Sequence, residues 1–457
     1  MLILANATVV TGDGATVISG GTVVTSDGRI TEVRERPPAG GRDGVVDLGG
    51  RLLVPGAINA HAHGGVVCPM FASGAPPLPP DRVLANLDYH LRGGTTTVLN
   101  LDGFNLPEEI EGSVRAHPIN LRAATIHFPL SVRAAEQADG SGLGPEHTAM
   151  TVEHMLRTGA VAIGEVGGGH TLAGGGQDYM YIPMAVERET GVRLTPHQAA
   201  EIKYAVLGRH VRVDAYDRAR LEAALAAAGL ADRMTPPRAR EIIHGCVLPS
   251  FDVALEGLRE AGRLAARHRV ATVVHTSAPS ESAIDDAADV AGRHLVSGHT
   301  NHSTFTVEEA LACARRLRAK GAWIEVCTLD AFGVRRLVTQ PDNMYALLRA
   351  DLVDLVATDY AGGHWDNPYV GLAHAVAAGV LALPKAVALA SRNVTRAFPG
   401  VAPDRGEIAP GNVADLVVCR GRLDQVDLVF VNGRLVCKDG VVRRPPGREE
   451  GTPCASS

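Results

Sequence analysis

The stretch GAINAHAH, residues 56–63, decides the fold, because it joins a short β-rich run to two histidines placed two residues apart. Side chains alternate between the two faces of a strand, so His61 and His63 point the same way. Two imidazoles in this arrangement can bind one divalent metal ion. The pattern predicts a strand whose C-terminal end carries a metal site.

Seven further β-rich segments follow and alternate with helical ones, which indicates a parallel sheet with helical crossovers. Helical segments include 145–159, 252–268 and 307–321. Eight parallel strands are the number that closes a (β/α)8 barrel, the TIM barrel of the α/β class. The expected strands are residues 56–63, 95–102, 122–128, 160–166, 269–275, 293–299, 322–328 and 353–359.

Both ends of the chain have a different texture, with short β-rich runs separated by Asp-Gly, Asn-Gly and Arg-Gly turns. Neither end has enough strands to bury a core alone, so we expect residues 1–54 and 405–457 to form one discontinuous β-sandwich. Residues 55–404 then form the barrel domain. An insertion at 171–245 is a candidate lid over the barrel mouth, and the last residues, 444–457, read as a loose tail.

Strong candidate metal ligands fall at the C-terminal ends of five of the expected strands. In a barrel these ends converge on one mouth, where active sites of this fold lie. A lone strand histidine is more often a hydrogen-bonded core residue, but the whole set together predicts a metal centre. Its nitrogen and oxygen donors suit zinc, with iron or manganese as alternatives. The six candidates are His61, His63, Glu165, His275, His299 and Asp359.

The sequence resembles the amidohydrolase superfamily over nearly its whole length. The resemblance is carried by LLVPGAINAHAHG (52–64), VVHTS around His275, GHTNH around His299, ATDY around Asp359 and GEIAPGNVADLVV (406–418). It implies that His61, His63 and Asp359 hold one metal ion, and that His275 and His299 hold a second.

Many binuclear members of that superfamily bridge their metals with a carbamylated lysine on the fourth strand. The four lysines of this chain, at 203, 320, 385 and 438, all lie elsewhere. The fourth strand ends instead with Glu165, and two neighbouring dications need a negative bridge. We therefore expect Glu165 to be the bridge. Glutamate at this place, together with HTNH, is similar to the enamidase and cyclic amidase branch.

The resemblance and the donor set together indicate a hydrolase that cleaves an amide C–N bond, in a small cyclic amide such as a lactam, imide or enamide. A metal-bridging hydroxide would attack the carbonyl, and Asp359 would carry the proton to the departing nitrogen. Deamination of a heterocycle is the first alternative, although Ala278 stands where the HxxE pattern of mononuclear deaminases places its glutamate. An N-acyl amino acid deacylase and a non-enzymatic scaffold are the others.

Other polar residues are weaker candidates for binding substrate. His302 follows His299 by three residues and could replace it as a ligand, His127 ends the third strand, and His170 follows the fourth. Tyr179, Tyr181 and Lys203, in the insertion, are further candidates.

Composition argues against nucleic acid and anionic lipid as partners, and the superfamily resemblance implies a small-molecule substrate. Lys and Arg total 44 against 50 Asp and Glu, so no general positive field exists to attract nucleic acid or anionic lipid. Seven scattered cysteines without CxxC spacing indicate reduced thiols. Without a signal-like or membrane-length apolar run, we expect a cytoplasmic protein, and the superfamily resemblance adds a homo-oligomer.

Overall fold

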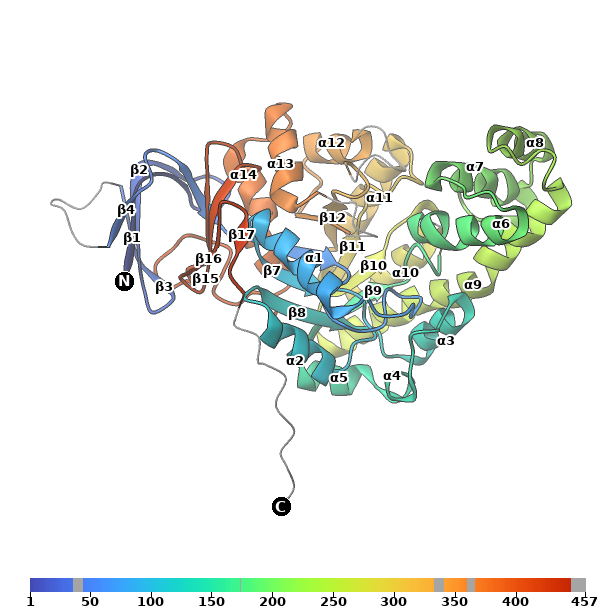
Figure 1. The fold of residues 1–457 in the computed structure, drawn as a ribbon, viewed down its shortest axis with the longest axis horizontal. Coiled ribbons are helices and arrows are strands. Elements are labelled where there is room, and N and C mark those ends of the chain that lie inside the picture. Colours follow the sequence, from blue (N-terminus) through green and yellow to red (C-terminus); the bar gives the residue numbers. More distant parts are fainter. Residues whose placement is uncertain (36–43, 173, 333–340, 360–365, 445–457) are drawn as a thin grey trace, which may run out of the picture.

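The computed structural model describes residues 1–35, 44–172, 174–332, 341–359 and 366–444. Its centre is a parallel sheet of eight strands in the sequential order β6 to β13, which confirms the predicted (β/α)8 barrel (Figure 1). The strands are β6 (Ala57–Ala62), β7 (Thr95–Asn100), β8 (Asn120–Thr125), β9 (Ala160–Val166), β10 (Thr272–His275), β11 (Leu295–Gly298), β12 (Trp323–Cys327) and β13 (Leu355–Ala357).

Hydrogen bonds between the first and last strands close the barrel. The backbone N–H of Asp359 donates to the carbonyl of His61 at 3.0 Å, and the Thr358 hydroxyl donates to the same carbonyl at 2.9 Å. The Asn59 side chain donates to the Thr358 hydroxyl at 2.8 Å. This closure brings two of the predicted ligands, almost 300 positions apart in the sequence, to adjacent strand ends.

Helices surround the barrel, as the alternating sequence pattern predicts. The expected helix at 145–159 is divided, because Thr151 caps a new helix by accepting a hydrogen bond from the His154 amide at 3.2 Å. The helices outside the insertion are α1 (Pro80–Arg92), α2 (Pro107–Ala116), α3 (Pro129–Ala138), α4 (Pro145–Ala149), α5 (Val152–Thr158), α9 (Pro236–His268), α10 (Glu281–Ala291), α11 (Val307–Ala319), α12 (Asp342–Arg349), α13 (Pro368–Ala377), α14 (Leu383–Leu389) and α15 (Arg392–Ala397), with single turns η3 (Ala278–Ser280) and η4 (Gly292–His294).

The insertion after β9 is helical and extends beyond the barrel, at the opposite end from the sheet of the chain termini (Figure 1). Its elements are η1 (Gln177–Tyr181), α6 (Ile182–Thr190), α7 (Pro196–Leu207), η2 (Val213–Ala215) and α8 (Arg218–Ala227). Helix α9 begins inside the expected insertion and continues through the helix expected at 252–268, so the two form one element.

The two ends of the chain form a second, separate sheet of nine strands. Its β14 pairs with β5, which joins the C-terminal half to the N-terminal half, and both halves enclose a common apolar core. Asn432-Gly433 and Asp439-Gly440, where we expected hairpin turns, have positive φ at both residues. We propose domain boundaries at 54/55 and 404/405, although strand β5 of this sheet continues one residue past the first boundary, to Pro55. The strands are β1 (Leu2–Val10), β2 (Val17–Ser26), β3 (Arg29–Arg34), β4 (Val45–Asp47), β5 (Leu52–Pro55), β14 (Leu416–Cys419), β15 (Val426–Val431), β16 (Arg434–Lys438) and β17 (Val441–Val442).

Three other expectations concern the cysteines, the C-terminal tail and membrane-spanning helices. The six cysteines within the described ranges are all free thiols. The expected loose tail lies outside the described residues from 445 onward. Within the described part of the chain, no helix combines the length and apolar character needed to cross a membrane.

The interior of the barrel is apolar at one end and polar at the other. Near the start of the strands it is packed with apolar side chains such as Ile58, Val296 and Leu355, and Phe398 and Val401 belong to the same cluster. Polar and charged side chains gather where the strands end, which leaves one end of a rigid, closed barrel for a functional site.

Gly56 connects β5 of one sheet to β6 of the other, and it packs closely against Thr96. A Cβ at Gly56 would lie 2.1 Å from the Thr96 hydroxyl oxygen and 2.7 Å from the Thr96 Cβ. Gly56→Ala should therefore destabilise the protein by about 1–3 kcal/mol through overpacking. Thermal unfolding measures this effect.

Gly112→Ala is the matched control, because Gly112 lies in α2 with nothing within 4 Å of its added Cβ. It should be neutral or slightly stabilising. An equal unfolding temperature for Gly56→Ala and the unchanged protein would contradict the role of this close packing.

Candidate metal centre

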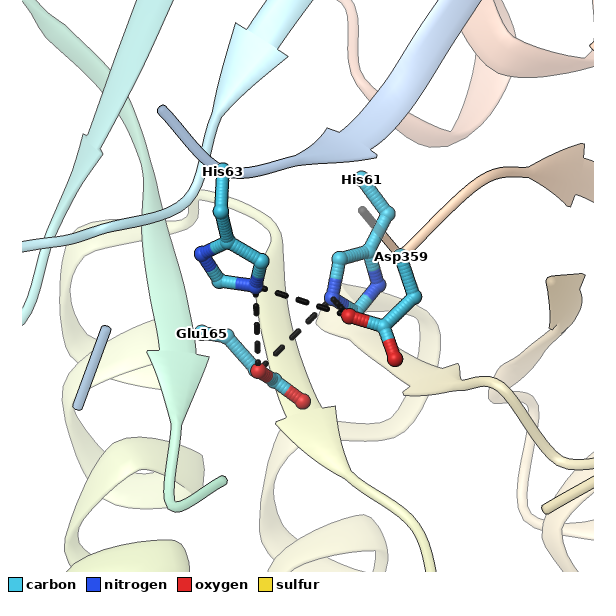
Figure 2. A group of neighbouring side chains, drawn as sticks. All are labelled: His61, His63, Glu165 and Asp359. Atoms are coloured by element: carbon cyan, nitrogen blue, oxygen red, sulfur yellow. Dashed lines mark ion pairs between the residues drawn. The ribbon is translucent and has the colours of Figure 1, made fainter. Parts of the chain in front are cut away.

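The structure brings all six predicted ligands together at the mouth of the barrel. Their potential ligand atoms form two groups, and within each group these atoms lie within 4.8 Å of one another. The first group contains His61, His63, Glu165 and Asp359, and Figure 2 shows these side chains converging. The second contains Glu165, His275 and His299. Glu165 is the member that the two groups share.

In the first group, two histidines face two carboxylates. Asp359 Oδ1 lies 3.5 Å from His61 Nε2 and 3.5 Å from His63 Nε2. Glu165 Oε2 lies 3.7 Å and 3.5 Å from the same two nitrogens. Donor atoms about 2.1 Å from a tetrahedral ion stand about 3.4 Å apart, so these separations fit four donors around one cation.

In the second group, the other oxygen of Glu165 faces two further histidines. Glu165 Oε1 lies 2.9 Å from His299 Nε2 and 3.2 Å from His275 Nδ1. The two carboxylate oxygens of one side chain are thus divided between two clusters of imidazole. This is the arrangement expected of a carboxylate that bridges two cations.

Two of these residues have a backbone conformation that side chains usually avoid. His299 has φ of 34° and Asp359 has φ of 48°, both in the left-handed region. Such conformations cost free energy and persist where the surroundings hold them, often at functional sites. The strain therefore lies in the backbone that aims two of the six ligands.

Two acidic residues that we did not predict contact the Nδ1 atoms of His61 and His63. Asp102 Oδ1 lies 3.1 Å from His63 Nδ1, and Glu325 Oε1 lies 2.7 Å from His61 Nδ1. Each carboxylate accepts a hydrogen bond from Nδ1–H, which leaves the Nε2 lone pair of the same ring free to bind a metal ion. The backbone amides of Gly64 and Phe71 in turn fix Asp102.

The buried charges show that this cluster favours positive charge. Burial lowers the pKa of His61, but the charges of Glu325 and Glu165 outweigh burial and raise the pKa to about 10. Burial likewise lowers the pKa of His299, whereas Glu165 and Asp359 raise it to about 9. Burial raises the pKa of Glu165, yet the surrounding histidines hold it well below its usual value. Divalent cations can take the place of these protons.

The chemistry of the donors fits two divalent metal ions. His61 Nε2 is buried and has no hydrogen-bond partner in the described part of the chain, although two carboxylate oxygens lie near it. Neutral imidazoles and carboxylates are the ligands that zinc, iron and manganese accept. The residues present can therefore hold the predicted ions.

A cavity opens onto this cluster, and two of the three histidines named as weaker candidates line it. His170 and His302 do so, whereas His127 does not. The His170 ring stacks on Phe71 with centroids 4.5 Å apart, and His302 Nδ1 lies 2.8 Å from the Thr304 hydroxyl. Burial, with the charges of His299 and His275, keeps the pKa of His302 well below its usual value.

Of the three candidates in the insertion, one lines the cavity and two do not. Tyr179 lines the cavity. Tyr181 does not, and its hydroxyl donates a hydrogen bond of 3.1 Å to Asp139. Lys203 is fully buried and donates to Asp178 at 2.7 Å. The cavity is also lined by the glycine-rich loop, including Gly168 and Gly176.

The sequence held a signal for the residues that we missed. Asp102 ends an expected strand, and Glu325 is an acidic side chain in the middle of the apolar segment AWIEVCT. An acidic residue in a buried strand needs a charged or hydrogen-bonded partner, which marks it as a candidate for the same site.

Comparisons with known proteins agree with this architecture. The model of the amidohydrolase family matches residues 52–436. The β-aspartyl dipeptidase of Fervidobacterium islandicum AW-1 superposes with a TM-score of 0.56 over 96% of this chain and 97% of its own, at 16% identity. A prolidase complexed with N-methylphosphonate-L-proline gives 0.57 over 96% and 100%, at 18% identity. D-Hydantoinase (dihydropyrimidinase) from Thermus sp. gives 0.51 over 97% of each chain, at 15% identity.

One curated relative matches a shorter region. Adenine deaminase 3 of Rhizobium meliloti (strain 1021) is 29% identical over 154 residues, which are 31% of this chain and 23% of that protein. The chain thus matches less than a quarter of that relative's length, and the solved structures share the fold. Because the family model covers most of the chain, the protein belongs to the amidohydrolase family of hydrolases.

The carboxylates behind the histidines generate a prediction. Asp102→Asn and Glu325→Gln should each weaken metal binding by about 10- to 100-fold, because the amide no longer fixes the tautomer of the ligand histidine. Competition with a chelator of known affinity measures the change.

Asp88→Asn is the matched control, since Asp88 pairs with His117 at 3.2 Å in another buried His–carboxylate pair outside the cluster. Its metal affinity should be unchanged. Unaltered metal affinity in both the Asp102 and Glu325 variants would show that these carboxylates do not support the ligands.

Proposed function

We propose that this protein is a metal-dependent amidohydrolase that opens an amide C–N bond in a small cyclic amide. The observation that carries the proposal is the division of the Glu165 carboxylate between two groups of histidine ligands beside a cavity. The proposed metal ligands are His61, His63, Glu165, His275, His299 and Asp359. Zinc is the preferred ion, with iron or manganese as alternatives.

When bound, two divalent ions supply an activated water molecule and an electrophile for the carbonyl oxygen. Asp359 performs the proton transfer in this proposal. Its carboxylate borders the cavity and faces His61 and His63 through Oδ1. It accepts the proton of the attacking water and donates it to the departing amide nitrogen, which is otherwise a poor leaving group.

A glutamate at the end of the fourth strand supports the enamidase and cyclic amidase branch of the family. The glycine-rich loop and the insertion contribute residues to the cavity, as expected of a lid that excludes water. We propose that substrate is held between this side and the metal cluster, where His170 and His302 line the wall.

Deamination is the second candidate, favoured by the partial match to an adenine deaminase. The two reactions release different products, because a deaminase releases ammonia and leaves the ring intact. Lactams, hydantoins, imides, N-acyl amino acids and adenine form a panel that separates them. Ring opening supports the proposal, whereas ammonia release from adenine alone would favour the deaminase.

Replacement of Glu165 tests the bridge. The protein should hold about two metal ions per chain, and Glu165→Ala should lower this content and abolish turnover, because both groups lose a shared negative ligand. Elemental analysis of purified protein measures the content. Two ions retained in the variant would contradict the bridging role.

Replacement of Asp359 tests the proton transfer. Asp359→Asn keeps an oxygen that can bind metal but cannot carry the proton, so kcat should fall by about 10²- to 10⁴-fold while the metal content is kept. Steady-state kinetics on a substrate from the panel, with elemental analysis, make the comparison. An unchanged kcat in the fully loaded variant would assign the proton transfer to another group.

A further inference from the structure

Asp330 is an acidic residue that faces the same cavity but belongs to neither group of ligands. It follows β12 by three positions and lines the cavity together with Glu165, His275 and Asp359. The residue is 9% exposed, and its Oδ2 atom is buried without a hydrogen-bond partner in the described part of the chain.

The position of Asp330 separates it from the metal ligands. Asp330 belongs to neither of the two groups of predicted ligands, whose ligand atoms lie within 4.8 Å of one another. Burial raises the pKa of Asp330 to about 7, whereas the charge of His299 and the backbone amide of Ser303 lower it. Its Oδ2 atom receives no hydrogen bond from the described residues.

A buried carboxylate oxygen without a donor is unfavourable, so structures usually provide one. The described residues that line this cavity include no lysine or arginine. The missing donor can therefore come from the molecule that fills the cavity. A nitrogen-bound hydrogen is the donor that an amide-containing ring can offer.

We propose that Asp330 determines specificity by accepting a hydrogen bond from a second N–H of the substrate, distinct from the nitrogen whose bond is broken. This inference rests on the proposed function and names its substrate class, namely cyclic amides that carry another ring N–H, as in a cyclic ureide. Asp359 serves the departing nitrogen, and Asp330 holds the other side of the ring. The apolar side chain of Leu329 and the Phe71 ring line the remaining wall.

Hydantoin and succinimide form a matched pair of probes, because succinimide has a CH₂ group in place of the second ring N–H of hydantoin. Binding is measured by calorimetry in the full-length Asp359→Asn variant loaded with zinc, so that turnover does not interfere. Hydantoin should bind about 10- to 100-fold more tightly than succinimide. Adding Asp330→Ala should reduce the ratio of the two affinities to about one.

Elemental analysis and the unfolding temperature accompany each variant. Asp342→Ala removes an exposed acid at the start of α12, outside the cavity, and should leave the ratio unchanged. The comparison of the two rings with Asp330 in place remains informative even if Asp330→Ala fails to fold.

Equal affinities, no binding of either ring, a preference that survives Asp330→Ala, or loss of a metal ion from that variant would each overturn the inference. These results are distinct from failure of the proposed function. An enzyme that opens amide rings without preferring hydantoin refutes only the role of Asp330. A clear preference in binding without hydrolysis of any amide refutes only the proposed reaction.

Discussion

The negative charge of Glu165, buried among four imidazoles, is the interaction on which the centre depends. Removing a carboxylate from water costs several kcal/mol unless positive charge and hydrogen bonds compensate for it. Here the compensation comes from His61 and His63 at one oxygen and from His275 and His299 at the other. A side chain held in this way favours cations on both of its sides.

The barrel provides the rigidity that this arrangement needs. Apolar packing fills the interior near the strand starts, and hydrogen bonds between Thr358, Asn59 and His61 close the ring beside the cluster. Asp102 and Glu325 then orient the two histidines of the first strand. The ligands come from distant parts of the sequence, yet each lies at or just after the C-terminal end of a barrel strand.

Much of this could be predicted from the sequence, because strand alternation and the position of each polar residue at a strand end are local signals. All eight barrel strands lie where they were expected, and His61 and His63 face one way as their spacing requires. Two features of the helices were not predicted. The helix at 145–159 is divided because Thr151 caps a new helix, and α9 is longer than expected because it continues from the insertion into the segment 252–268 without a break.

Contacts between strands were harder to predict than the strands themselves. Glu325 and Asp102 are visible in the sequence as acids in apolar surroundings, but the histidine that each would contact depends on how neighbouring strands are registered. Asp330 lies three residues beyond the end of β12, where the alternation of side chains along a strand no longer predicts which way a side chain points. The assignment of Glu165 relied on the absence of a lysine from the fourth strand, which is a property of composition.

The central claim is that one carboxylate links two metal ions. Anomalous diffraction from crystals of the purified, metal-loaded protein, collected on both sides of the metal absorption edge, tests it most directly. The account predicts two anomalous peaks about 3.5–4 Å apart, one beside each oxygen of Glu165. A single peak, or two peaks that Glu165 does not join, would contradict it.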